Sequence, residues 1–245
     1  MTREFLDAGL RLLAKRVDAI QMGPGNAESR EPHSLLPWLS QRAVVAEMKT
    51  GKRPRSGMGA LRERWPAHDH FVEDLLSYAL WKGNWHANIV QQESMLQQVS
   101  GYPDLPALMH DIALKDLRAA RNNLYFRVQI IAAVLAQQEP ALHEAIQELY
   151  DVIGSSWTDV YQHLLDLHNC HLRSDVPMER FADMLTAAAE GVALRQLVDR
   201  RPRVIDEVEE RSLLGYLIMA IVAGCVRKQG DDRTVDEIVR SLERA

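Results

Sequence analysis

The chain has 245 residues, of which 47% are apolar and 26% are charged, and its formal net charge is −5. This balance is typical of a folded soluble protein and argues against one that coats nucleic acid non-specifically. The longest apolar run, residues 213–226, is too short to span a bilayer, and the N-terminus has no apolar signal core, so we expect a cytoplasmic protein without membrane contact. Cys170 and Cys225 form no disulfide framework and no metal-ligand spacing.

Helical periodicity dominates the sequence, and patterns typical of strands are nearly absent. The first predicted helix covers residues 2–21, with an apolar stripe that starts at Phe5. Residues 22–38 are polar and rich in helix breakers, which indicates a loop. Ser40 is a good N-cap for a second helix, and residues 50–54 then interrupt the helical pattern.

A short third helix is predicted to start at Ser56 or Gly57 and to bury Leu61 and Trp65, which lie four residues apart. Pro66 disfavours helical geometry in the residue before it, so we expect this helix to end at Trp65. A fourth helix follows, with an apolar face formed by Phe71, Leu75, Leu76 and Ala79.

The rest of the chain is predicted to be an all-helical body. We expect helices at about 85–99, 105–121, 123–137, 140–170, 178–198 and 207–228, and a short one near 234–243. Glu207, Glu209 and Glu210 are interpreted as the acidic start of the helix over 207–228, where the helix dipole favours negative charge. The predicted fold class is therefore all-α.

A local cluster of basic residues stands out on this acidic chain. Residues 42–64 contain seven Lys or Arg and two Glu, which gives a local net charge of +5. A basic island of this kind is typical of a compact phosphate-binding site. Charges that only keep a loop solvated would give the same count.

Residues 40–76 resemble the DNA-binding half of the TetR/AcrR family of transcriptional regulators. Gly59, Leu61, Trp65 and Pro66 fall at the Gly, Leu, Phe and Pro positions of the family's recognition-helix signature. Departures from that signature include Arg62, at a position where the family usually has a phosphate-contacting Tyr. Further along, the stretch from Phe181 to Arg195 resembles the penultimate helix of many family members.

The resemblance implies a helix-turn-helix DNA-binding domain of three helices over residues 1–76, with an insertion at about 22–38. Residues 77–245 would then form a helical bundle for ligand binding and dimerisation. The implied function is that of a ligand-responsive repressor, not an enzyme, which binds a palindromic operator in double-stranded DNA as a homodimer. Its effector would be a small organic molecule, and no cofactor is implied.

In a helix-turn-helix the N-terminal residues of the second helix meet the base edges. Glycines in the first turn of that helix remove side chains where DNA could approach, although Gly57 and Gly59 could also serve only to pack it against the first helix. The expected DNA-binding residues are Ser40, Arg42, Lys52, Arg53, Arg55, Ser56, Gly57, Met58, Gly59, Arg62 and His68.

Aromatic side chains with a polar group suit the wall of a pocket for a flat organic ligand, and they suit an ordinary core equally well. The candidate ligand-binding residues are Trp81, Trp85, Tyr125, Phe126, Trp157 and Tyr161.

The predicted helices over 178–198 and 207–228 carry wide apolar faces, which we expect to form a two-fold interface, with a purely internal core as the alternative. The residues of these faces are Ala182, Leu185, Ala188, Ala189, Val192, Leu214, Leu217, Ile218, Ile221 and Val222.

The histidine-rich stretch 163–171 leaves a second interpretation open. His163 and His171 would lie about two turns apart on one helix, with Asp166 near the same flank and His168 pointing elsewhere. This spacing is poor for zinc, so we expect no metal site. An all-helical metal-binding protein or enzyme that uses this cluster is the alternative function. A third possibility is a family member that has lost DNA binding and acts through protein contacts.

Overall fold

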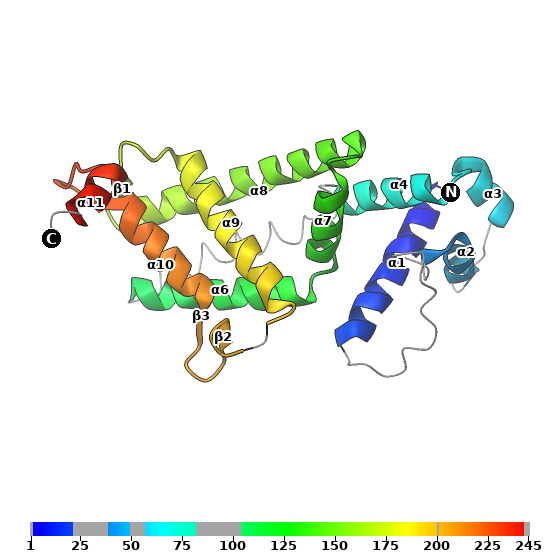
Figure 1. The fold of residues 1–245 in the computed structure, drawn as a ribbon, viewed down its shortest axis with the longest axis horizontal. Helices are drawn as coiled ribbons and strands as arrows, with labels where there is room; N and C mark the ends of the chain where they lie inside the picture. The colour runs from blue at the N-terminus through cyan, green and yellow to red at the C-terminus, as the bar shows by residue number, and fades with distance from the viewer. Residues whose placement is uncertain (1, 22–38, 50–56, 82–103, 200, 243–245) are drawn as a thin grey trace. The chain divides into compact units, whose positions relative to one another are not determined.

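The computed structural model describes residues 2–21, 39–49, 57–81, 104–199 and 201–242 (Figure 1). The chain divides into two compact units. The first unit comprises residues 1–84 and 124–149, and the second unit comprises residues 85–123 and 150–245. Helices predominate, which confirms the predicted all-α class. Within the described ranges, no helix is both long and apolar enough to cross a membrane.

The first unit is built from α1 (Thr2–Gln21), α2 (Gln41–Lys49), α3 (Met58–Arg64), α4 (His68–Leu80), α7 (Leu124–Leu135) and the start of α8 (Pro140–Leu167). The predicted bounds of the first helix are confirmed. The Ser40 cap is also confirmed, because the backbone N–H of Ala43 donates to the Ser40 hydroxyl at 3.3 Å. The predicted helix over 85–99 lies outside the described residues.

Helices α1 and α4 pack at close range in the first unit. The predicted apolar face of α4 is buried, as expected from its spacing. A Cβ atom on Gly9 would lie 2.9 Å from the side chain of Leu75 and 3.2 Å from the ring of Phe71, so only glycine allows this approach. The Tyr78 hydroxyl adds a polar link between the two helices, since it donates to Asp7 at 2.8 Å and accepts from Arg3 at 3.2 Å.

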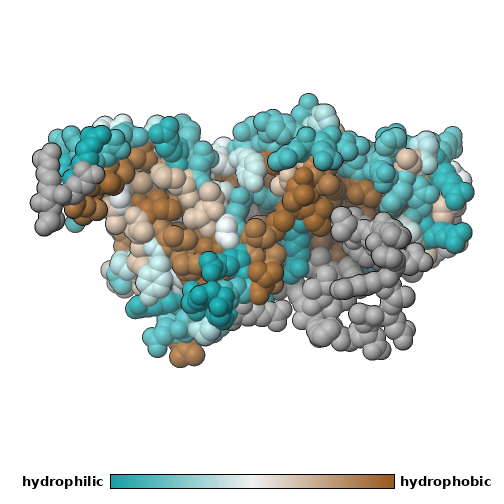
Figure 2. Space-filling view, in the orientation of Figure 1, coloured by the Kyte–Doolittle hydropathy of each residue, from teal (hydrophilic) through white to brown (hydrophobic). Residues whose placement is uncertain are grey.

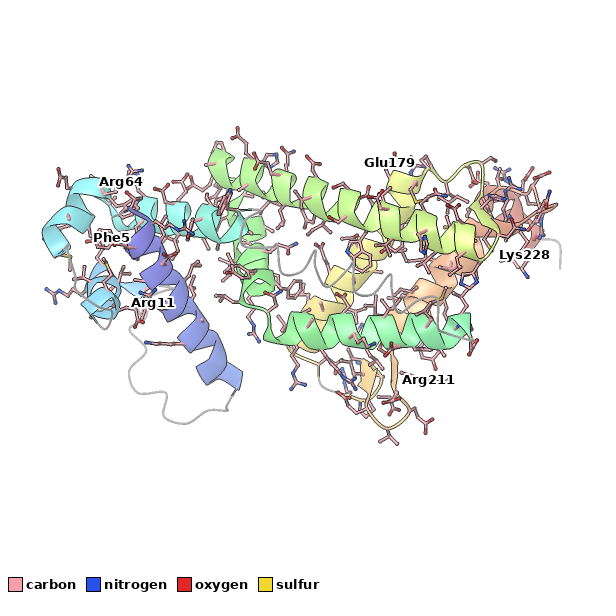
Figure 3. All side chains as sticks on the ribbon, turned by 180° about the vertical axis from the view of Figure 1, so that it is seen from behind. Phe5, Arg11, Arg64, Glu179, Arg211 and Lys228 are labelled. Atoms are coloured by element: carbon pink, nitrogen blue, oxygen red, sulfur yellow. The ribbon has the colours of Figure 1, made fainter. Side chains whose placement is uncertain are left out.

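A buried carboxylate joins α2 to α1. Glu47 is 7% exposed and accepts hydrogen bonds from Lys15 at 2.7 Å and from Arg11 at 3.3 Å. Arg11 is labelled on α1 in Figure 3. The hydrogen bond from Lys15 lowers the pKa of Glu47, and the hydrogen bond from Arg11 acts in the same direction, both against the opposing effect of burial. Glu47 is therefore held as a carboxylate between two cations.

The second unit contains α6 (Leu105–Asn122), the remainder of α8, α9 (Met178–Gln196), α10 (Leu213–Cys225) and α11 (Val235–Leu242). Helix α6 packs against both α9 and α10. Part of the core gathers around Phe181 and Leu185 of α9, Val176 and Cys225, with Ile218, Ile221 and Val222 of α10 packed against them. Cys225 is a buried free thiol.

Two short antiparallel pairs of strands lie among the helices, consistent with the near absence of strand patterns in the sequence. Strand β1 (Cys170–Leu172) pairs with β4 (Val226–Lys228), and β2 (Ile205–Asp206) pairs with β3 (Arg211–Ser212). The helix predicted over 140–170 therefore ends at Leu167, and the backbone of Asn169 turns away with a φ of +50°. Asn tolerates this left-handed conformation better than most residues, which ends the helix before β1.

The helix predicted over 207–228 is also shorter than expected. It begins at Leu213, after the Ser212 hydroxyl accepts a hydrogen bond from the Gly215 N–H at 3.1 Å. Residues 207–210 form the turn between β2 and β3, so their interpretation as an acidic helix start was wrong. The Asp206 carboxylate accepts from the N–H groups of Val208 and Glu209, and such local bonds compete with helix formation.

Arg173 joins separate segments near the C-terminal end of the second unit by hydrogen bonds. Its buried guanidinium donates to the carbonyl oxygens of Gly224 and Arg233, each at 2.7 Å, and to the Asp231 carboxylate at 3.1 Å. Hydrogen bonds from Arg233 and Arg173 hold the pKa of Asp231 well below its usual range. One side chain thus ties α10 to the segment that leads into α11.

Candidate functional site

Trp65 anchors the short helix α3 to the rest of the first unit. Its ring is 1% exposed and makes edge-to-face contacts with Phe5 of α1, at 5.9 Å between centroids, and with Phe71 of α4, at 5.1 Å. The indole N–H donates to the Asp74 carboxylate at 2.7 Å. Leu61 is fully buried beside it, as its spacing from Trp65 predicted. Figure 3 labels Phe5 on α1 and Arg64 on α3. These contacts set the position of α3 relative to α1 and α4.

The opposite side of α3 is open. Gly57 and Gly59 are exposed, and a Cβ atom on either would meet no atom of the described residues within 4 Å. The alternative in which these glycines only permit tight packing against the first helix is therefore wrong, and Gly9 fills that role instead. Arg62 is exposed, with no ionic partner in the part of the chain that the structure describes.

Other predicted DNA-binding residues have different surroundings. Ser40 caps α2, and Arg42 is exposed on that helix. Met58, the first residue of α3, is half-buried. His68 is also half-buried, and its ring stacks on Phe71 at 6.3 Å, so at least one face of the imidazole contacts the core. Lys52, Arg53, Arg55 and Ser56 lie outside the described residues.

Arg64 was not predicted as a site residue, and its contacts give it a structural role. Its guanidinium carbon lies 5.5 Å from the centroid of the Trp65 ring, and it pairs with Asp74 at 3.8 Å. Arg62 and Arg64 therefore differ, although both are exposed cations on a seven-residue helix. Sequence spacing alone could not separate them, because it does not locate Asp74.

Two of the predicted ligand-binding aromatics are neighbours in the second unit. Trp157 and Tyr161 lie one turn apart on α8 and stack with 5.5 Å between centroids and 17° between planes. Tyr161 also meets the edge of Phe181 on α9 at 5.6 Å. Both residues of the stacked pair are half-buried, so they form a wall that is partly accessible to solvent.

Sequence reasoning missed Asp116, a half-buried acidic residue of α6. Burial raises the pKa of Asp116 to about 6. Burial of Tyr161 together with the charge of Asp116 raises the pKa of the Tyr161 hydroxyl, so the two side chains are close enough to interact. A lone Asp on a helix has no sequence signature that reveals such an environment.

The remaining aromatic candidates belong to the first unit or lie outside the described residues. Trp81, the C-cap residue of α4, is 49% exposed. Tyr125 is half-buried and Phe126 is buried, and both lie on α7. Trp85 lies outside the described residues. Phe126 fits the alternative of an ordinary core residue.

The residues of the predicted interface faces on α9 and α10 are partly buried in the core and partly exposed at the surface. Ala182, Leu185, Val192 and Leu214 are buried inside the second unit. Leu217 is 37% exposed, and Leu194 and Tyr216, which were not predicted, are each 49% exposed. Hydrophobic surface lies over α9 and α10 in Figure 2. The half-buried residues of the predicted faces are Ala188, Ala189, Ile218, Ile221 and Val222.

The histidine-rich stretch does not form the single helical face that its metal interpretation needs. His163 and Asp166 lie on α8, whereas His171 lies in β1 beyond the end of that helix. Gln162 donates to Asp166 at 2.8 Å. Among the described residues, no three His, Cys, Asp or Glu side chains are arranged to hold a metal ion.

A shallow surface depression of about 780 Å³ follows the end of α9, and none of the predicted site residues lines it. It is lined by residues that include Arg195, Asp199 and Arg201. Asp199 accepts two hydrogen bonds of 2.7 Å from Arg201 and lies 3.6 Å from Arg195. The charges of this depression are thus largely paired with each other.

No protein-family model and no curated protein matches this sequence. Among solved structures, a TetR transcription regulator from Haloarcula marismortui is similar over 92% of this chain and 98% of its own, with a TM-score of 0.54 and 14% identity. The multidrug binding protein EbrR, solved in complex with proflavin, aligns over 89% of this chain and 98% of its own, with a TM-score of 0.47 and 16% identity. The first comparison shows that this chain has the all-α fold of a TetR transcription regulator.

Proposed function

We propose that this protein is a ligand-responsive transcriptional regulator, a repressor that binds a palindromic operator as a homodimer. The observation that carries the proposal is the two-sided character of α3. Leu61 and Trp65 are fully buried on one side, whereas Gly57, Gly59 and Arg62 are exposed. The similarity in fold to a TetR transcription regulator supports the same conclusion.

The open side of α3 suits close approach to a DNA groove. A recognition helix must bring its first turn against base edges, and side chains there would hold the backbone away. Gly57 and Gly59 leave space at this turn that none of the described residues fills. Arg62, one turn further along, can reach a base edge or a phosphate with its guanidinium. We assign DNA binding to residues 1–76.

Phosphate contacts are assigned to the basic residues around α3. Lys52 and Arg53 precede the recognition helix in the sequence, and Arg42 is exposed on α2. Each lost phosphate contact flattens the dependence of log K on log salt by about 0.9. Substitution of Lys52 or Arg53 by Ala should therefore weaken binding to all duplexes and reduce this slope by about one unit.

Ligand response is proposed to act through α4. The Trp65 contacts with Phe71 and Asp74 tie α3 to α4, so a tilt of α4 must also move α3. Two recognition helices of a dimer fit successive major grooves at a separation of about 34–36 Å. A ligand that prefers the tilted state would weaken DNA binding by its differential affinity, commonly about 1–3 kcal/mol.

The decisive experiment selects bound fragments from random duplexes and then measures their affinity for variants. Arg62→Ala combined with Arg55→Ala should weaken binding to the selected duplex without lowering the unfolding temperature, because the exposed Arg62 side chain contributes little to packing. Arg240→Ala is the matched control, since Arg240 is an exposed cation on α11 that pairs with Asp236. Unchanged affinity of the double variant for every duplex would refute the proposal.

A further inference from the structure

We propose that His110 is a proton-sensitive latch of the second unit, whose neutral imidazole holds α6 against the first turn of α10 and whose protonation releases that turn. The inference goes beyond the proposed function, because it assigns to the fold a response to mild acid. His110 lies on α6, and the turn that it contacts comprises residues 213–216 of α10. Both helices belong to the second unit and pack against each other.

The His110 ring is enclosed where the two helices meet. It is 9% exposed and lies edge-to-face with the Tyr216 ring, with 5.0 Å between centroids. A Cβ atom on Gly215 would lie 2.3 Å from the His110 Nδ1 atom, so this position of α10 has no room for a larger residue. The contact between the helices therefore depends on a close fit between the imidazole and the first turn of α10.

Protonation of His110 would place an N–H group where it has no acceptor. A neutral imidazole carries a hydrogen on one ring nitrogen only, whereas an imidazolium carries one on both. The Nδ1 atom is buried and has no hydrogen-bond partner in the part of the chain that the structure describes. The neutral ring can keep its hydrogen on Nε2, but the protonated ring must also bury a charged donor at Nδ1. An unpaired donor of this kind is costly.

The charges and dipoles around His110 also oppose a positive ring. Burial lowers the pKa of His110, and the charge of Arg211 in β3 lowers it further. Arg211, which Figure 3 labels, donates to the Tyr216 hydroxyl at 3.1 Å, so the cation is held beside the aromatic neighbour of His110. The first turn of α10 contributes the positive end of a helix dipole and contains no acidic residue. On α6 itself, the adjacent Asp111 pairs with Lys115 at 2.8 Å.

The latch should therefore hold at neutral pH and fail in acid. The folded-state pKa of His110 lies below the ordinary value of 6.5, so the stabilising effect of the neutral ring is complete above pH 6.5. It is lost as the pH falls from there through the folded-state pKa. Within this window, an opening that takes up one proton becomes about ten-fold more favourable for each unit of pH.

The released turn adjoins the face that we propose for dimerisation. Tyr216 is 49% exposed and Leu217 is 37% exposed, and both directly follow the glycine that contacts His110. Opening of the first turn of α10 should thus also weaken the dimer, a consequence that rests on the proposed function. The latch itself does not depend on dimerisation.

Nuclear magnetic resonance on the full-length protein tests the latch. The imidazole signal of His110, assigned through its backbone, should titrate at a lower pH than that of His163, which is exposed on α8. Hydrogen-exchange protection factors of residues 213–217 should fall by up to about ten-fold for each pH unit below 6.5. His110→Asn should abolish this fall, because Asn does not titrate. His163→Asn is the matched control and should retain it.

A titration midpoint of His110 at or above that of His163 would overturn the inference, and this measurement needs no variant. A fall in protection that persists in His110→Asn would overturn it as well, since another group would then take up the proton. Sedimentation at about pH 7.5 and pH 5.5 separates these results from the proposed function. A wild-type protein that is monomeric at both would refute the dimer and not the latch. A dimer that weakens in acid, except in His110→Asn, would support both.

Discussion

Trp65 and Asp74 are joined by a hydrogen bond of 2.7 Å from the indole N–H to the carboxylate. The bond links the C-cap residue of the short helix α3 to the middle of α4. The same carboxylate lies 3.8 Å from the Arg64 guanidinium, so Asp74 serves both residues at the junction. The orientation of α3 therefore depends on a residue in the next helix.

Trp65→Phe should lower the free energy of unfolding by about 1–3 kcal/mol, because it removes the hydrogen bond to Asp74 and part of a buried aromatic surface. Trp81→Phe is the matched control and should change it by less than about 0.5 kcal/mol, since Trp81 is half exposed. Urea denaturation of both variants measures the difference. Equal effects would show that the Trp65 junction contributes no special stability.

Substitution of two helical glycines by alanine should have opposite effects. Gly9→Ala should destabilise the protein by about 1–3 kcal/mol, because the new methyl group would lie 2.9 Å from Leu75. Gly59→Ala should stabilise it by about 0.5–1 kcal/mol, since alanine favours the helix and the added methyl group meets no atom within 4 Å in the part of the chain that the structure describes. Thermal unfolding of the two variants measures the direction of each change in stability. Gly59→Ala should also weaken duplex binding if DNA approaches this turn.

The Glu47 carboxylate should stabilise the fold only above acidic pH. Its folded-state pKa is lowered, so its contribution is present above the unfolded value of about 4.3 and is lost as the pH falls through the folded-state value. Glu47→Gln should therefore lower the free energy of unfolding at pH 7, with a difference that shrinks in acid. Glu63→Gln, on the exposed side of α3, is the control. A difference independent of pH would contradict the ion-pair explanation.

The Asp116 carboxyl group should have the opposite effect on the free energy of unfolding, which it should lower as the pH rises. Its folded-state pKa of about 6 lies above the unfolded value, so the ionised carboxyl group destabilises the folded state, increasingly so as the pH rises from about 4 to above 6. Asp116→Asn should raise the free energy of unfolding at pH 7.5 by at most about 3 kcal/mol, and by much less at pH 4. Urea titrations of this variant and of Asp111→Asn at the two pH values measure the effect. An Asp116→Asn variant that is less stable than the wild-type protein at pH 7.5 would contradict this expectation.

Leu217→Glu should disrupt the proposed dimer. Leu217 is 37% exposed on α10, so a carboxylate there can remain solvated in a monomer and would be buried unfavourably in an apolar interface. Sedimentation should give a dimer for the wild-type protein and a monomer for the variant, with loss of binding to palindromic duplexes. Val239→Glu, at an exposed position on α11, is the control. A wild-type protein that sediments as a monomer at micromolar concentration would rule out this interface.

The sequence by itself determined the features that depend on residues close along the chain. The Ser40 cap, the burial of Leu61 with Trp65 and the apolar face of α4 all follow from spacings of three or four residues, and the structure confirms them. The same local reasoning missed the β2–β3 turn because an Asp that binds nearby N–H groups can stop a helix whose periodicity otherwise continues.

Only the tertiary structure decided which residues are closely packed, which are buried, and which have a shifted pKa. The sequence could not show that Gly9, and not Gly57 or Gly59, permits a close helix contact, because that depends on the distant Leu75. It could not separate the buried Leu214 from the exposed Leu217 on one apolar helix, since periodicity does not reveal what covers a face. Asp116 is the clearest case. The protonation of a carboxyl group depends on the atoms that surround it, and the fold brings these from other helices.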